Sequence, residues 1–232
     1  MNTAQIIKRA FKAVDQKLRT ASIAEVGGFR PPDLQVSSWF GGHFLAHQGE
    51  AWPTNEHGPL LPLLQVVVAE LPYVPAPMQS LALLQVFIDR QKLPLELPAT
   101  DGHGWKLRRY TDTSALCPCE TPAEASRLRP FPIRWTVGNN EAPAWDDMWD
   151  TQEHHDFCKL DNAIELFHDR YRAFPATKVG GWPSWIQASF GVTAEFVIQI
   201  ASEEKSRWMA ADNGNIYVFH DQGRWSLVWD CY

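Results

Sequence analysis

Gly180-Gly181, followed by Trp182-Pro183, stands 139 residues after an earlier glycine pair, Gly41-Gly42. Two further short sequence motifs recur in the same order. Leu64-Gln65-Val66 matches Ile198-Gln199-Ile200 at a separation of 134 residues, and residues 84–89 match residues 215–221 at a separation of 132. Trp52-Pro53 also matches Trp182-Pro183, although it lies much farther from its glycine pair. The pattern predicts two imperfectly repeated, β-rich halves that pack into one unit.

The composition is that of a folded chain. The protein has 232 residues, of which 45% are hydrophobic and 21% charged, enough for one domain or two small ones and too apolar for a disordered chain. The 14 glycines and 17 prolines show no collagen-like period. No apolar run approaches the roughly 18 residues that a membrane-spanning helix needs, so we expect no membrane partner.

Two segments have the apolar period of an α-helix. In residues 3–24, apolar side chains recur along one face at Ile6, Ala10, Val14 and Leu18, and Gly27-Gly28 end the pattern. In residues 151–172, the spacing of three and four extends through Phe157, Leu160, Ile164, Phe167 and Tyr171. We therefore predict an N-terminal helix over 3–24 and a second helix over 151–172.

The remainder favours strands and loops. Residues 36–87 contain short apolar runs between prolines and glycines, 89–140 is loop-rich with a strand at 133–137, and further strands are predicted at 196–201, 216–220 and 225–229. The fold class is thus predicted as α+β. We expect one unit over 1–232, with a first half at 36–140, a second half at 176–232, and the helix 151–172 between them.

Several short motifs resemble those of the YwqG-like family of bacterial proteins of unknown function. The most distinctive is residues 178–187, and weaker matches are Phe40-Gly41-Gly42, Trp52-Pro53 and residues 59–65, 70–72, 198–200, 212–219 and 229–232. The resemblance covers most of 36–232, and residues 90–175 depart from the family pattern. It implies a shared fold and, because some members occur beside secreted toxins as immunity proteins do, a tendency toward partner binding. It implies no catalytic residues.

Charge and cysteine content bear on partners and compartment. The net charge is −6, which argues against a nucleic-acid partner because such proteins carry a basic face. Residues 141–170 contain nine acidic and two basic side chains. This segment is either a solvated helix face or a surface that attracts a basic partner. Four cysteines do not make a secreted disulfide framework in a chain this long, and the first residues lack the apolar core of a signal peptide. We expect a cytoplasmic protein.

Common catalytic motifs are absent from the sequence, including the glycine-rich phosphate loops, GxSxG and HExxH. A polar stripe on the second predicted helix, His154, Cys158, Asp161 and Glu165, has the residue types that bind zinc, but it equally suits the border of a packing face. Cys158 one turn after His154 suggests a thiol nucleophile, which acidic surroundings would disfavour. We assign no catalytic residue, metal or cofactor.

The chain contains 11 tryptophans, most of which we expect in the core. Trp145 and Trp149 differ, because they stand among acids immediately before the second helix. We predict a partner-binding face made of Glu141, Trp145, Asp146, Asp147, Trp149 and Asp150, with aromatic anchors and steering charge. The alternative is that both rings fold inward and the acids favour the helix N-terminus.

These observations favour a non-enzymatic immunity or antitoxin-like protein that binds a protein partner, possibly a toxin effector. The first alternative is a small-ligand or carbohydrate-binding module that uses exposed tryptophan rings. The second is an uncharacterised metal-dependent enzyme that uses the His154 stripe.

Overall fold

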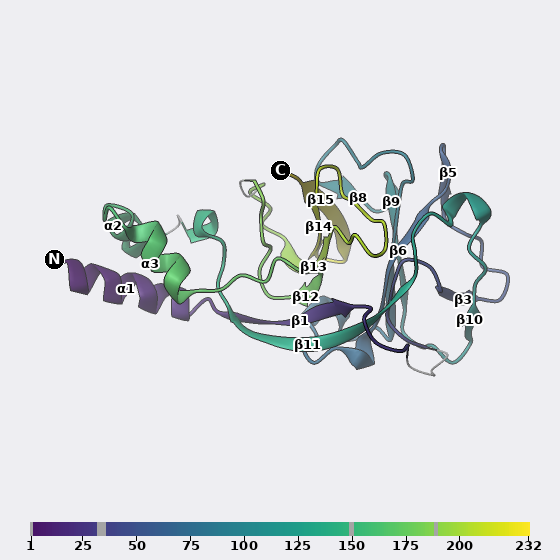
Figure 1. Ribbon diagram of the computed structural model, residues 1–232, viewed down its shortest axis with the longest axis horizontal. Coiled ribbons are helices and arrows are strands. Elements are labelled where there is room, and N and C mark those ends of the chain that lie inside the picture. The colour runs from purple at the N-terminus through teal and green to yellow at the C-terminus, as the bar shows by residue number, and fades with distance from the viewer. Residues whose placement is uncertain (1, 32–35, 149–150, 188–189) are drawn as a thin grey trace.

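The computed structural model describes residues 2–31, 36–148, 151–187 and 190–232. Figure 1 shows the helices α1 (Thr3–Asp15), α2 (Gln152–Phe157) and α3 (Ala163–Arg170) gathered at one end of the molecule, and a curled β-sheet at the other. Two long central strands, β1 (Arg19–Val26) and β11 (Phe131–Glu141), join the two ends. Short 3-10 helices are η1 (Val68–Glu70), η2 (Ala76–Met78), η3 (Ala123–Ala125) and η4 (Trp145–Met148).

Within the described residues, eleven strands form one antiparallel sheet. Its order is β8 (Ala99–Thr100), β15 (Arg224–Asp230), β14 (Asn215–Asp221), β13 (Glu195–Ala201), β12 (Lys178–Gly180), β1, β11, β2 (Trp39–Phe40), β6 (Leu61–Val67), β7 (Leu83–Ile88) and β9 (Trp105–Tyr110). Two small sheets pair β3 (Leu45–His47) with β10 (Leu116–Pro118) and β4 (Thr54–Asn55) with β5 (Gly58–Pro59). The β-rich α+β class predicted from the sequence is confirmed.

The strand order reads the same outward from the centre in both directions. β12, β13, β14 and β15 follow β1 on one side, as β2, β6, β7 and β9 follow β11 on the other. In the pairing of β1 with β11, Glu25 lies opposite Arg134, Ala24 opposite Trp135 and Val26 opposite Ile133. A two-fold axis through the Glu25–Arg134 pair exchanges β1 with β11 and so exchanges the other two pairs. Both inner strands also shift register at the same point, between Pro62 and Leu64 in β6 and between Phe196 and Ile198 in β13.

A buried glutamine makes the same hydrogen bonds in each half. Gln65 Oε1 accepts from Leu45 N (3.0 Å) and its amide donates to Ser37 O (2.9 Å). Gln199 Oε1 accepts from Ser184 N (2.8 Å) and its amide donates to Ala176 O (3.0 Å). In both cases the amide fastens the segment before a Gly–Gly turn to the segment after it. The predicted duplication is thus present in the backbone, with the separations of 139 and 134 residues.

One proposed equivalence, Trp52 with Trp182, is wrong. Trp182 follows its Gly–Gly turn directly, whereas Trp52 comes ten residues after Gly42 and packs against Phe87, with ring centroids 5.4 Å apart. The residue that packs on the matching Phe219 is Trp185, stacked at 6.0 Å and 13°. Different segments therefore bring an indole to the same place on the outer face of each half.

The main core fills the inside of the curled sheet. Its members are chiefly apolar residues from strands of both halves, such as Phe40, Leu64, Val86, Ile198 and Val218, all with 0% exposure. A separate small core lies among the helices and includes Ala10, Val14, Phe157 and Phe167. We call α1, η4, α2 and α3 the helical cap, because they share this second core at the end of the body.

The N-terminal helix is shorter than the predicted 3–24. Asn2 caps α1, accepting from Gln5 N at 2.9 Å, and the helix ends at Asp15. Arg19 begins β1, where Ala21 and Ser22 are fully buried against β11 and β12. The alanines of this segment suit a helix, but pairing on both sides in the centre of the sheet overrides that local preference.

The predicted helix 151–172 is two helices with a turn at 158–162. Thr151 caps α2, accepting from His154 N at 3.2 Å. The break changes the direction of the apolar helix face, so that Phe157 and Phe167 are buried while Ile164 is 54% exposed.

The segment 89–140, predicted as loop-rich around one strand, also contains β9 and β10. In β9, Lys106, Arg108 and Arg109 stand among the buried Trp105, Leu107 and Tyr110, so the apolar residues show no regular alternation in the sequence. Arg108 is a charged residue that is itself buried, where it pairs with Glu50 at 3.1 Å.

Candidate functional site

A cleft of about 600 Å³ opens between the helical cap and the second half of the sheet. Residues drawn from 142–145 and 167–175 line the cap side, and residues drawn from 183–187, 201–202, 213–215 and Tyr232 line the other. This volume is within the range of small-ligand and peptide pockets. The cleft exists because the chain between β11 and β12 is long enough to carry η4, α2 and α3.

The walls combine aromatic rings with amides. Trp145, Tyr171 and Trp185 supply ring surface, and Gln187 and Asn213 supply exposed amides. Trp185 is fixed from both sides, because its Nε1 donates to Asp147 Oδ2 of the cap at 2.9 Å and its ring stacks on Phe219. The Tyr171 hydroxyl lies within hydrogen-bond distance of Phe11 O (3.0 Å) and Asp15 Oδ1 (2.9 Å), so this wall is held to α1.

A buried ion pair adjoins the cleft, because its lysine contacts Ser184 of the cleft wall. Lys178 and Glu141 are both fully buried and in contact through Lys178 Nζ and Glu141 Oε1. Glu141 also accepts from Phe174 N (2.8 Å) and Trp182 N (2.9 Å), and Lys178 Nζ donates to Ser184 Oγ (2.8 Å). Burial lowers the pKa of Lys178 from 10.5 to about 8, although the Glu141 carboxylate opposes the shift.

Gly181 makes room for this network. Its φ is +75°, which favours glycine, and a Cβ there would collide with Glu141 Oε2. The second glycine pair of the repeat is therefore needed for the approach of Glu141 as well as for the turn.

The Ser184–Lys178 contact is a possible catalytic arrangement, since a neutral lysine can accept the proton of a serine nucleophile. Here Glu141 favours the charged ammonium, and the Ser184 hydroxyl donates to Phe174 O at 3.1 Å. The network joins the end of β11, the segment after α3 and the Gly–Gly turn. Its geometry fits a fastening of the cap to the sheet better than it fits a general base.

The three predicted partner-binding residues whose side chains the structure describes, Glu141, Trp145 and Asp147, do not form one exposed face. Glu141 is fully buried in the ion pair, so its assignment to a surface is corrected. Trp145 is half-buried and its ring packs against His154 (4.7 Å) and Phe167 (5.3 Å). Trp149, Asp150 and the side chain of Asp146 lie outside the described residues.

Three exposed acids of the cap lie farther along the chain. Asp161, Glu165 and Asp169 are all exposed on or just before α3, and Ile164 stands exposed among them. We call these four residues the acidic stripe. The three acids are four residues apart within the acid-rich 141–170 segment, a spacing typical of one helix face, although Asp161 itself precedes α3. The prediction centred on Trp145 and Trp149 did not include them.

The proposed metal stripe is dispersed by the break between α2 and α3. His154 is buried with Nε2 3.4 Å from Cys158 Sγ, whereas Asp161 and Glu165 are exposed. In the part of the chain that the structure describes, no three His, Cys, Asp or Glu side chains gather closely enough to hold a metal ion. Burial raises the pKa of the Cys158 thiol, which disfavours the thiolate that a nucleophile requires.

Comparison with known families gives one match. The family model described as a domain of unknown function, DUF1963, matches residues 38–222, which contain the strands β2 to β14 and the inserted helices α2 and α3. No curated protein matches the chain. Among the described helices, none is long and apolar enough to cross a membrane.

Proposed function

The chain belongs to the DUF1963 family of domains of unknown function, and from the arrangement of its cap and cleft we propose that it is a non-enzymatic binding protein. Its partner is a basic protein, in which an exposed segment lies against the acidic stripe and enters the cleft. The observation that carries this proposal is the position of the stripe on the same cap that forms one wall of the aromatic cleft.

Charge and surface chemistry support such a partner. Asp161, Glu165 and Asp169 are exposed and attract positive charge over a Debye length of about 10 Å. Ile164, 54% exposed in their midst, offers an apolar contact of the kind that anchors an interface. The titratable groups under the cleft, Glu141 and Lys178, are engaged with each other and with backbone groups.

The finer proposal is an immunity or antitoxin-like role, in which binding neutralises a toxin effector in the bacterial cytoplasm. The resemblance to YwqG-like proteins supports it, because some of these occur beside secreted toxins. Four free cysteines in a chain of this length are consistent with a reducing compartment.

A test begins with co-purification of the intact chain from its native host, followed by kinetics with the captured partner. The triple variant Asp161→Lys, Glu165→Lys, Asp169→Lys should slow association at least 10-fold at low salt and flatten its salt dependence. Asp112→Lys, Glu120→Lys, Glu124→Lys is the matched control, since it makes the same charge change at exposed positions of the first half. If the two triple variants slowed association equally, the acidic stripe would not be part of the binding site. The absence of any specific protein partner would refute the proposal as a whole.

A small-ligand module is the second candidate, and the size and aromatic walls of the cleft favour it. Stacking on Trp185 would then be the main contact. Binding of a glycan or metabolite that Trp185→Ala abolishes, with no protein partner, would support this alternative.

A further inference from the structure

The charge of the chain changes sign where the acidic stripe reaches the cleft. The three acids of the stripe are followed by Arg172, which is exposed and is one of the residues that line the cleft. His168, one residue before the last acid of the stripe, lines the cleft as well. A ligand that lies along the stripe and ends in the cleft therefore meets negative charges first and a positive charge last.

Arg172 differs from its neighbour Arg170 in having no carboxylate partner. Arg170 pairs with Asp15 of α1 at 3.1 Å, and its guanidinium lies over the Phe11 ring. Arg172 accepts from Ala142 N through its backbone O (3.2 Å), but its side chain forms no ion pair or hydrogen bond with the described residues. An exposed guanidinium of this kind can bind a carboxylate from outside the chain through two parallel hydrogen bonds.

No carboxylate side chain competes for this cation inside the cleft. Among the described residues that line it, none is Asp or Glu. Two carboxylates next to the wall are already engaged. Asp230 Oδ2 accepts from Ile186 N (2.8 Å) and Gln187 N (3.1 Å), and Asp147 Oδ2 accepts from Trp185 Nε1 (2.9 Å). The charge of the cleft therefore favours an anionic group, although the stripe beside it favours a basic one.

The rest of the cleft suits an apolar side chain, above all a flat one. Trp145 and Tyr171 line it from the cap, and Pro183 and Trp185 line it from the other side. Aromatic rings and prolines give a flat side chain a large apolar contact. The C-terminal residue of a protein offers both groups that the cleft favours, because its carboxylate and its side chain are attached to the same carbon atom.

We propose that the part of the partner that enters the cleft is its C-terminal end. The terminal carboxylate binds Arg172, the aromatic side chain of the last residue lies against the walls of the cleft, and basic residues before it lie along the acidic stripe. This inference rests on the proposed function, because it specifies which segment of the basic partner the cleft receives.

The test titrates the intact chain by calorimetry with four probes. They are acetyl-Lys-Gly-Lys-Gly-Phe with a free C-terminus, the C-terminal amide of the same peptide, acetyl-Glu-Gly-Glu-Gly-Phe with a free C-terminus, and phenylacetate. We expect the first peptide to bind about 10-fold more tightly than its amide, because only the acid has a charge for Arg172. It should also bind about 10-fold more tightly than the glutamate peptide, which the stripe repels.

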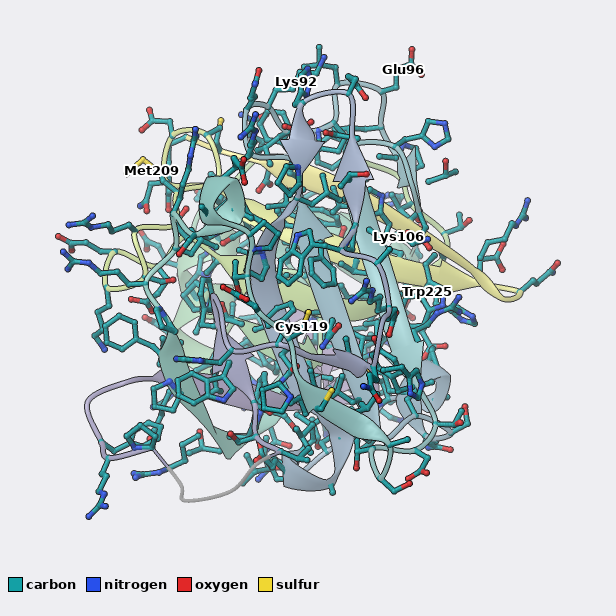
Figure 2. All side chains as sticks on the ribbon, turned by 90° about the vertical axis from the view of Figure 1, so that its right-hand side faces the viewer. Lys92, Glu96, Lys106, Cys119, Met209 and Trp225 are labelled. Atoms are coloured by element: carbon teal, nitrogen blue, oxygen red, sulfur yellow. The ribbon has the colours of Figure 1, made fainter. Side chains whose placement is uncertain are left out.

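Arg172→Gln should remove the preference for the acid and leave the affinity of the amide unchanged, a result that loss of folding would not produce. Arg30→Gln is the matched control, because Arg30 is exposed in the connection between β1 and β2 of the first half. Lys92→Gln is a second control, since Lys92 belongs to the end of the sheet body that faces away from the cap (Figure 2). Neither control should change the preference.

The inference is overturned if the acid and the amide bind equally, or if Arg172→Gln keeps the preference. It is also overturned if phenylacetate binds as tightly as the peptide acid, which would assign the cleft to small aromatic carboxylates. With a captured partner, removal of its last residue should weaken binding about 10-fold. Unchanged binding would overturn this inference alone, whereas failure to capture any protein would refute the proposed function.

Discussion

The two halves of the sheet share their backbone hydrogen bonds and differ in the side chains placed on them. Two residues before each Gly–Gly turn, the first half has Trp39 and the second has Lys178, and each lies opposite the equivalent glutamine of the neighbouring strand, Gln65 or Gln199. Four residues after the first glycine, the first half has Leu45 and the second has Ser184. The duplicated scaffold thus needs the glutamine and the turn, while the polar network belongs to the half that carries the cap.

The connections explain why the cleft of about 600 Å³ lies on the second half. The chain from β1 to β2 spans residues 27–38, whereas the equivalent chain from β11 to β12 spans 142–177 and carries η4, α2 and α3. The longer connection forms the cap side of the cleft on the second half. The buried ion pair lies at its two ends, because Glu141 is the last residue of β11 and Lys178 the first of β12.

The largest expected effect comes from Lys178→Met, which gives the second half an uncharged residue as in the first. It leaves the Glu141 carboxylate buried without its cation, so we expect a loss of about 3–5 kcal/mol in the free energy of urea unfolding at pH 7. Adding Glu141→Gln should recover part of this loss, because an amide oxygen still accepts from Phe174 N and Trp182 N. A single-variant cost below about 1 kcal/mol would contradict the burial of an intact ion pair.

The next effect tests the equivalence of the two glutamines. Gln65→Leu and Gln199→Leu each leave a buried N–H and a carbonyl without a partner, and we expect a cost of about 2–4 kcal/mol in each case. Exposed Gln48→Leu is the control and should change stability by less than about 0.5 kcal/mol. If one of the two buried substitutions were harmless, the shared hydrogen bonds would not be the basis of the duplicated fold.

A smaller difference is expected at the ends of β7 and β14, where Asp89 and Asp221 occupy matching positions. Burial alone would raise the pKa of Asp89, but hydrogen bonds from His57, Gln91 N and Asn55 outweigh burial and lower the pKa below 3.8. Asp89→Asn should cost about 1.5–3 kcal/mol at pH 7. Asp221→Asn should cost less than about 0.5 kcal/mol, because its ion pair with Arg224 is exposed.

The sign of the pH dependence follows from the lowered pKa of Asp89. The folded carboxylate holds its proton less tightly than the unfolded one, so its contribution is present above pH 3.8 and is lost as the pH falls through the folded value. The stability difference between the wild type and Asp89→Asn should therefore narrow below pH 3.8. A difference that grows in acid would contradict this assignment.

The smallest effect compares the indoles over Phe87 and Phe219. Trp52 Nε1 donates to Leu60 O within its own half, whereas Trp185 Nε1 donates to Asp147 of the cap, both at 2.9 Å. Each substitution to Phe should cost about 1 kcal/mol. Amide hydrogen exchange at 145–148 should rise in Trp185→Phe and stay unchanged in Trp52→Phe; equal exchange in both would show that this bond does not hold the cap.

The repeat could be predicted because its matching motifs keep their order and separation in the chain. The register of equivalent strands in the sheet requires both. β1 could not, since Ala21 and Ala24 carry no strand preference and only their pairing on both sides makes them a strand. Glu141 was assigned to the surface with its acidic neighbours, because the partner that buries it, Lys178, is 37 residues away in the chain.

The central place of β1 has a consequence for the order in which the molecule assembles. Both of its neighbours are made late, β11 beginning at Phe131 and β12 at Lys178. During synthesis the first strand leaves the ribosome long before either edge is covered, and contacts of such large sequence separation make folding slow. A chain halted before residue 178 would keep one side of β1 open, and it is in that interval that the protein would most depend on chaperones.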